Sequence, residues 1–235
     1  MPALTPERQF DALLAAQPTR PFVTYYDEAS GERSELSAKS LANWVAKTHH
    51  LLVDELGLGV GDTARIALPA HWISVPILLG CLTAGLALDD SGAGDVAFVT
   101  PDTLDSAAGS GDAFAVNPAA AAVGFRDGGP AGAGDYVTAV RPQADTWPSV
   151  HLTAAPEDAC LPGLTRGETA KRAAGAGLPA GARLLSTRPW SGAEDWLATV
   201  LAPIAVGGSV VLVVNCADDA VLQRRAEQER VTVRS

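Results

Sequence analysis

Hydrophobic residues along the chain follow two patterns, short continuous runs and runs spaced as on one face of a helix. The run Phe22–Tyr26 is rich in aromatic and β-branched residues, and the chain returns through Arg33–Leu36 after a turn, which predicts a β-hairpin. Ser37 then stands in the position of a helix cap, and the hydrophobic spacing after it predicts a helix to about Glu55. The glycines of Gly57–Gly61 end that helix.

The rest of the chain predicts strands separated by helices. A helix capped by Ser74 is expected after the strand Ala64–Leu68, and the capping-box spacing of Thr165 and Glu168 predicts the start of a later helix. The expected strands and later helices are Ala64–Leu68, Leu86–Leu88, Val96–Thr100, Ala113–Val116, Ala182–Ser186, Ser209–Val214 and Val231–Val233, with helices at Ser191–Ala205 and Asp218–Glu229. This alternation predicts an α/β fold with mainly parallel sheets.

Two segments without any charged residue are long enough to cross a bilayer. They are Ile66–Leu88 and Trp196–Val214. Pro69 and Pro76 interrupt the first and Pro203 interrupts the second, so each segment is interpreted as a helix followed by a buried strand. We therefore expect no membrane span and no membrane partner.

The two halves of the chain repeat one order of elements. Arg65 precedes Trp72 by seven residues, and Arg183 precedes Trp190 by seven, each within the order turn, strand, helix, glycine, strand. This order predicts two flavodoxin-like lobes related by an internal repeat, and the alternative is that any two βαβ units share it. The expected organisation is a first α/β lobe at 1–123, a Gly/Pro-rich connection at 124–162 and a second, truncated lobe at 163–235.

Composition narrows the classes of partner. The chain has 235 residues, 47% of them hydrophobic, which is enough for a substantial core. Its net charge of -10 repels phosphate backbones, so nucleic acid is excluded as a partner. Cys81, Cys160 and Cys216 have no metal-binding spacing and are expected to be reduced thiols. Charged residues near the N-terminus, without an apolar run, predict a cytoplasmic protein.

The segment Gly57–Leu88 resembles the N-terminal core of the adenylate-forming superfamily, which includes acyl-CoA synthetases, peptide-synthetase adenylation domains and luciferases. In that family a helix ends in a G-x-x-x-G-D turn, a strand ends in Leu-Pro, and a Leu-x-Ala-Gly turn leads into an apolar strand. The matching residues here are Gly57–Asp62, Leu68-Pro69, Leu82–Gly85 and Leu86–Leu88, with Leu36-Ser37 upstream and Leu201–Leu212 downstream. The resemblance extends over most of the chain and concerns the scaffold.

The chain departs from this family where the family binds ATP. The family holds the phosphates with a Ser/Thr/Gly-rich loop ending in Pro-Lys-Gly, whereas the corresponding stretch Gly124–Arg166 contains no lysine. Trp190-Ser191-Gly192 replaces the family's aromatic-histidine pair, and the sequence ends at Ser235, before the adenine-site motif, the ribose-binding aspartate and the catalytic lysine domain. The resemblance implies a truncated, degenerate member of this family. We expect such a protein to bind ATP, AMP or an acyl adenylate weakly.

Seven residues follow the predicted strands, where open α/β sheets place their ligand sites. They are His71, Trp72, Asp89, Asp90, Ser186, Thr187 and Trp190. Together they predict a cleft between the lobes that binds a small molecule. The alternatives are a solvated turn for the two aspartates and packing at a lobe interface for the others.

Other motifs are interpreted as structural. Gly124–Gly134 lacks lysine, serine and threonine and is expected to be a loop, while Gly57–Gly61 precedes a strand and so does not have the order of a dinucleotide site. His49-His50 are adjacent on a helix and cannot chelate one ion, so no metal site is predicted. His71 and His151 have no nucleophile in a recognisable elbow, so no catalytic residue is assigned.

Three functions remain open at this point. The first is a non-catalytic module that binds a small molecule or nucleotide. The second is an interaction or assembly subunit, as a homodimer or with a protein partner, which predicts an exposed apolar patch after Val233. The third is an active acyl-adenylating enzyme or CoA ligase, for which the sequence lacks a lysine placed near the phosphates.

Overall fold

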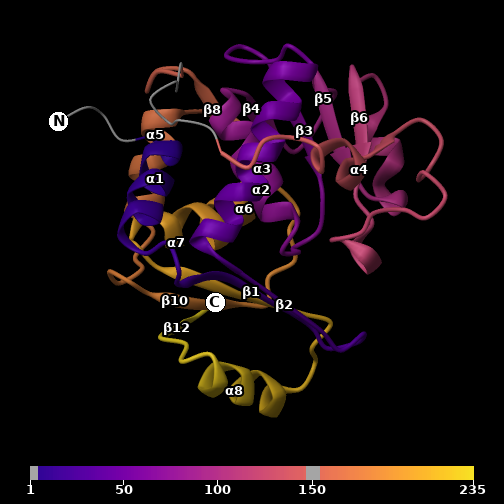
Figure 1. Ribbon diagram of the computed structural model, residues 1–235. Helices are drawn as coiled ribbons and strands as arrows, with labels where there is room; N and C mark the ends of the chain where they lie inside the picture. Colours follow the sequence, from indigo (N-terminus) through magenta and orange to yellow (C-terminus); the bar gives the residue numbers. More distant parts are fainter. Residues whose placement is uncertain (1–4, 147–153) are drawn as a thin grey trace.

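A computed structural model describes residues 5–146 and 154–235. It contains two five-stranded sheets and a two-stranded hairpin, with helices between and around the sheets (Figure 1). The α/β class with mainly parallel sheets, expected from the sequence, is confirmed.

The sheet formed by the first half of the chain, sheet B, is parallel throughout. Its strand order is β4-β3-β5-β6-β7. The bounds are β3 Thr63–Ala67, β4 Ala87–Asp89, β5 Val96–Val99, β6 Asp112–Ala115 and β7 Gly134–Asp135. The central strand β5 is buried at every position, as continuous apolar runs in parallel sheets predict.

Sheet A combines strands from both ends of the chain. Its order is β12-β10-β11-β1-β2, parallel except for the antiparallel pair of β1 and β2, which is the hairpin expected from the sequence. The bounds are β1 Pro21–Asp27, β2 Glu32–Ser37, β10 Arg183–Ser186, β11 Ser209–Val214 and β12 Val233–Arg234. The hairpin, which the sequence placed in the first lobe, thus pairs with a strand of the second. The division of the chain into lobes at 124–162 stays a prediction.

Both sheets place three consecutive parallel strands in the same way. In sheet B the chain runs through β3, then β4 on one side of it, then β5 on the other. In sheet A it runs through β10, then β11 on one side, then β12 on the other. This 2-1-3 order is the flavodoxin-like order, and its occurrence in both sheets is what an internal repeat predicts.

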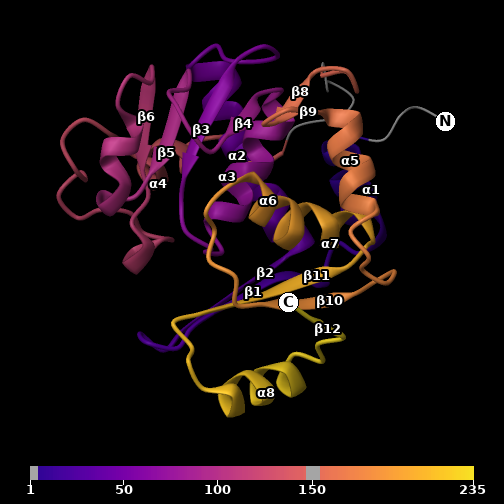
Figure 2. The same ribbon diagram turned by 180° about the vertical axis from the view of Figure 1, so that it is seen from behind.

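Helices fill the space between the two sheets, and α8 covers the far face of sheet A (Figures 1 and 2). The α-helices are α1 Pro6–Ala16, α2 Ala38–His50, α3 Ser74–Ala84, α4 Tyr136–Val140, α5 Arg166–Ala174, α6 Ala193–Trp196, α7 Ala202–Ala205 and α8 Asp219–Gln228. Two π-helical segments, η1 Leu51–Glu55 and η5 Leu197–Leu201, and two 3-10 helices, η2 Pro101–Ala107 and η3 Pro118–Ala120, complete the set within the described residues. One hydrophobic core contains residues of both sheets and of the helices between them.

Local signals located most helix ends correctly. Ser37 caps α2 by accepting from the Ser40 backbone N–H at 3.1 Å, and Thr165 and Glu168 form the expected capping box of α5. The prediction that Ser74 caps α3 is wrong, because Ser74 is already the first helical residue and its side chain makes no capping bond. Helix α1 was not predicted at all.

Two further expectations concern surfaces. No helix in the described part of the chain is long and apolar enough to cross a membrane. The apolar patch expected after Val233 is absent from the residues described, where the exposed large hydrophobic side chains are Val60 and Val123 and Val233 is partly buried.

A buried arginine joins distant parts of the chain. Arg166, at the start of α5, is fully buried and forms an ion pair with Glu7 of α1, itself almost fully buried. Its guanidinium donates to the carbonyl oxygens of Leu82 and Leu86, each at 2.9 Å, at the turn between α3 and β4. Burial lowers the pKa of Arg166 to about 10, so the side chain keeps its charge at neutral pH.

We expect Arg166→Met to destabilise the protein by about 3–5 kcal/mol, because the buried Glu7 carboxylate and two carbonyl oxygens lose their partner. Urea-induced unfolding followed by circular dichroism measures this. The matched control is Arg172→Met on the same helix, whose exposed ion pair with Glu194 contributes less than about 1 kcal/mol. Equal losses in the two variants would contradict the role given to Arg166.

Candidate functional site

One cavity lies at the carboxyl edge of sheet B, where the strand order reverses. After β3 the chain continues to β4 on one side and then to β5 on the other, so the connections leave a crevice beyond the ends of these strands. A cavity of about 440 Å³ occupies this place, within the range of small-molecule sites. It is lined by Arg65–Pro69, Asp90, Thr100, Asp102, Thr103, Ser106, Pro118, Trp190–Gly192 and Trp196.

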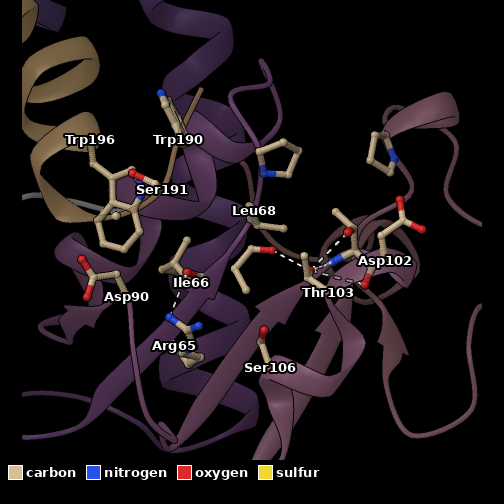
Figure 3. Close-up of a pocket in the computed structure, with 15 residues that line it drawn as sticks. Arg65, Ile66, Leu68, Asp90, Asp102, Thr103, Ser106, Trp190, Ser191 and Trp196 are labelled. Atoms are coloured by element: carbon tan, nitrogen blue, oxygen red, sulfur yellow. Dashed lines mark hydrogen bonds between the residues drawn. The ribbon is translucent and has the colours of Figure 1, made fainter. Parts of the chain in front are cut away.

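The cavity has walls of different origin (Figure 3). Figure 3 shows Trp190, Ser191 and Trp196 on one side, Asp102 and Thr103 on the other, and Arg65 at its base. The first wall belongs to the loop after β10 and to helix α6, whereas the second belongs to η2, after β5. The site is therefore formed by segments about a hundred residues apart in sequence.

Three N–H groups around the cavity are buried and have no hydrogen-bond partner. They are Nε of Arg65 and Nε1 of Trp190 and of Trp196. Trp196 is only 2% exposed, so water does not readily satisfy its indole N–H. A buried unpaired donor costs about 1–3 kcal/mol, which a ligand with acceptor atoms would recover. The donors favour an anionic or acceptor-rich ligand.

The wall formed by η2 is already hydrogen-bonded. Thr103 donates its hydroxyl to the carbonyl oxygen of Ala67 at 2.7 Å and accepts from the Thr100 backbone N–H at 2.8 Å. These bonds tie the start of η2 to the end of β3. This wall supplies shape to the cavity, while the free donors lie on the other side and at the base.

The helix behind Trp196 has an irregular turn. The π-helical segment η5 follows directly after Trp196, and Pro203 lies just beyond it. Proline has no N–H to donate to the carbonyl four residues earlier, so the helix widens locally. Single π turns of this kind are frequent at functional sites.

The structure brings two of the seven candidate residues to this cavity. Asp90 and Trp190 line it, as expected from their position after predicted strands. Asp89 instead holds its own turn by accepting from the backbone N–H of Ser91 at 2.8 Å. Ser186 is buried at the end of β10 and accepts from the Arg188 backbone N–H, and Thr187 faces a separate hollow beside α8. Ligand binding by any of the seven stays a prediction.

His71 and Trp72 lie against the β1–β2 hairpin. The His71 ring contacts the Tyr25 ring at 4.3 Å between centroids, and Trp72 Nε1 donates to Glu32 Oε1 at 3.1 Å. Because the Ile73 backbone N–H donates to His71 Nδ1, the proton of the neutral ring is on Nε2, which is 3.9 Å from Glu32 Oε2. Burial lowers the pKa of His71 to about 4, against the opposing effect of the nearby carboxylates.

The remaining motifs of the sequence are the glycine-rich loop, the histidines and the cysteines. In the loop 124–134, the Asp135 carboxylate accepts from the Phe125 backbone N–H at 2.8 Å, so a protein anion already occupies that donor. His50 pairs with Asp54 at 2.7 Å, and His151 lies outside the described residues. Cys81, Cys160 and Cys216 are free. No cluster of three metal-binding side chains exists in the part of the chain that the structure describes.

The stretch expected to lack a phosphate loop contains a tight hairpin. Strands β8 Ala159–Leu161 and β9 Leu164–Thr165 are joined by Pro162-Gly163, with Gly163 at φ +71°. The Gly/Pro-rich connection expected at 124–162 thus contributes strand β8 to a small sheet. A two-residue turn has too few backbone N–H groups to surround a triphosphate.

The sequence did not single out Arg65, Trp196, Ser191, Thr103 or Ser106 as site residues. Arg65 was noted only as a marker of the repeat, and Trp196 only as the start of an apolar run. Arg65 is the second residue of the predicted strand Ala64–Leu68, so the rule for carboxyl strand ends did not point to it. Nothing local distinguishes Trp196 from a core tryptophan.

Comparisons with known proteins give one close relative and a shared fold. No family model matches the chain. A TIGR03089 family protein of Mycobacterium tuberculosis (strain ATCC 25618 / H37Rv) is 41% identical over 230 residues, which are 94% of this chain and 94% of that protein.

The chain also resembles solved ligase structures. An anthranilate CoA ligase, AuaEII, in complex with anthranoyl-AMP superposes with a TM-score of 0.77 at 13% identity, over 100% of this chain and 50% of that one. A Brucella canis acyl-CoA synthetase superposes with a TM-score of 0.75 at 16% identity, over 98% of this chain and 47% of that one. The chain therefore spans about half the length of these structures, and the likeness shows the shared fold.

We expect acidification to destabilise the protein through His71. Its pKa is about 4 in the folded state and about 6.5 in the unfolded chain, so below pH 6.5 the unfolded state binds the extra proton. The contribution of neutral, buried His71 to the free energy of unfolding is complete above pH 6.5. As the pH falls to 4, up to about 3 kcal/mol of this contribution is lost.

Urea unfolding between pH 4.5 and 8 measures this dependence. The control is His71→Asn, whose side-chain oxygen can still accept from the Ile73 backbone N–H but does not titrate. The variant should lose less stability on acidification than the wild type, with a constant difference above pH 7.5. Parallel profiles over the whole range would assign the effect to other groups.

Proposed function

The chain belongs to the TIGR03089 family, and from this premise we propose that it binds an acyl adenylate or AMP, without adenylating a substrate itself, in the cavity between β3, η2 and α6. The observation that carries the proposal is the set of three unpartnered N–H donors of Arg65, Trp190 and Trp196 around this cavity. Phosphate and carboxyl oxygens are acceptors of the kind that these donors lack.

The likeness to ligases supports the choice of ligand class. The anthranilate CoA ligase with the same fold was solved with anthranoyl-AMP, a ligand with a phosphate group and an acyl carbonyl. The cavity here contains apolar surface from Ile66 and Leu68 beside the donors. An acyl adenylate combines an apolar acyl group with acceptor atoms and so matches both features.

The lack of lysine in the described lining of the cavity supports a binding role. Lys39, Lys47 and Lys171 are the lysines of the chain, and none of them lines the cavity. Histidine and cysteine are also absent from its lining within the described residues. The ionisable side chains that line the cavity are Arg65, Asp90 and Asp102, so it offers a cation and hydrogen-bond donors for binding and lacks the lysine that the resemblance associates with catalysis.

The free thiols favour a reducing compartment as the location of the protein. All three cysteines are unpaired, and Cys81 and Cys160 are buried. Burial raises the pKa of both thiols, which keeps them in the unreactive protonated form. Free thiols are typical of reducing compartments, and we extend the proposal to the cytoplasm.

We expect a non-hydrolysable acyl-adenylate analogue, and more weakly AMP, to raise the melting temperature. A ligand at a hundred times its Kd stabilises the folded state by about 2.7 kcal/mol. Trp196→Phe should weaken binding about 2- to 10-fold because it removes one hydrogen bond, and Arg65→Met about 10- to 100-fold because it removes a charged one.

The matched control is Trp44→Phe, a partly buried tryptophan that packs on Trp72 and does not line the cavity. Its affinity should equal that of the wild type. ATP with magnesium and CoA complete the series. If none of the four ligands shifts the wild type, or if Trp196→Phe binds as tightly as the wild type, the proposal is wrong.

A further inference from the structure

Asp90 connects sheet B to the cavity wall formed by α6. It directly follows β4 of sheet B, and its Oδ2 accepts from the backbone N–H of Ala193 at 2.8 Å. Ala193 is the first residue of α6, in the helical run that supports sheet A. This bond therefore joins a loop of one sheet to a helix start 103 residues later.

The bond occupies a helix terminus that has no cap of its own. The residue before the helix is Gly192, which has no side chain, and no side chain of its own segment caps the first turn. Orphan N–H groups at a helix start need an acceptor, and here a carboxylate from the other sheet supplies it. The negative charge also complements the helix dipole.

Gly192 is needed for this approach. A Cβ at this position would lie 2.3 Å from Asp90 Oδ2, much closer than any real contact. The backbone of Gly192 is extended, with φ 169°, so its conformation does not require glycine. The close contact with Asp90 is the reason for a glycine here.

A second carboxylate holds the same loop from within. Asp195 accepts from the Ser191 backbone N–H at 2.7 Å and from its hydroxyl at 2.8 Å. Trp190 and Trp196, which carry two of the free donors, lie on either side of this segment. Asp195 bonds within the loop, whereas Asp90 bonds to the helix start beside it from the other sheet.

We propose that Asp90 is a positioning residue for the cavity. Through its hydrogen bond to the Ala193 backbone N–H, it keeps the indole N–H groups of Trp190 and Trp196 at a fixed position relative to Arg65. This inference rests on the function proposed above, because it states how that site is kept in its binding geometry. Asp90 acts through the helix start, and the ligand need not touch it.

Hydrogen exchange and ligand affinity test the proposal together. In the free protein, Asp90→Ala should speed amide exchange at Ala193 about tenfold, and it should weaken binding of the acyl-adenylate analogue about five- to tenfold. Asp90→Asn keeps an acceptor oxygen of the same size and should restore both values to within about threefold of the wild type.

Gly192→Ala tests the same contact from the other partner. Its methyl group displaces the Asp90 carboxylate, so it should reproduce the effects of Asp90→Ala while leaving Asp90 intact. The matched controls are Asp95→Ala, which removes a similar bond to the Thr63 backbone N–H, and Gly59→Ala, where a methyl group meets nothing closer than 4.0 Å. Neither control residue lines the cavity, and both should bind as the wild type does.

The two measurements separate the possible failures. Unchanged exchange at Ala193 in both Asp90→Ala and Gly192→Ala overturns the positioning role. Faster exchange with unchanged affinity overturns it too, because the contact would then be structural only. If the wild type does not bind the analogue, the proposed function fails, and the exchange result alone upholds or overturns the contact.

Discussion

The fold depends on placing one arginine charge inside the protein. The Arg166 guanidinium lies where α1, α5 and the α3–β4 turn meet, and it is paired there with Glu7 and two backbone carbonyls. A buried charge is tolerated only where its partners are held in place, so these three segments have to assemble together. The same contact fixes the turn that leads into β4. Asp90 follows β4 directly, so the position of the cavity wall depends on this interaction as well.

Two kinds of polar group have different roles in this molecule. Arg166 and Asp90 have partners in segments far from them in the chain, and Asp195 has its partner within its own loop. Around the cavity the indole N–H groups of Trp190 and Trp196 have none. Buried donors are nearly always paired in folded proteins, and the unpaired ones here are the basis on which we propose a ligand. Their position at the strand-order reversal of sheet B agrees with the rule for open α/β sheets.

Much of the secondary structure could be predicted from local sequence, because local forces form it. Ser209–Val214 is a strand with the predicted bounds, and Thr165 forms the capping box that its spacing to Glu168 indicates. Helix α1 was missed because some of the residues that it buries are polar. Glu7 and Gln9 are buried there, where Glu7 meets Arg166 and Gln9 donates to the Ala170 carbonyl. Such polar contacts across 160 residues leave no periodic hydrophobic signal.

By itself the sequence determined the α/β class, most of the strands and helices, and the strand ends that Asp90 and Trp190 follow, since hydrophobic period and capping residues act over a few positions. Only the tertiary structure decided that the hairpin 21–37 joins sheet A, that His71 packs against this hairpin, and that Arg65 and Trp196 share a cavity. The direction in which a strand or helix residue points depends on which sheets and helices pack together. That pairing is set by contacts between residues far apart in the chain, which no local pattern contains.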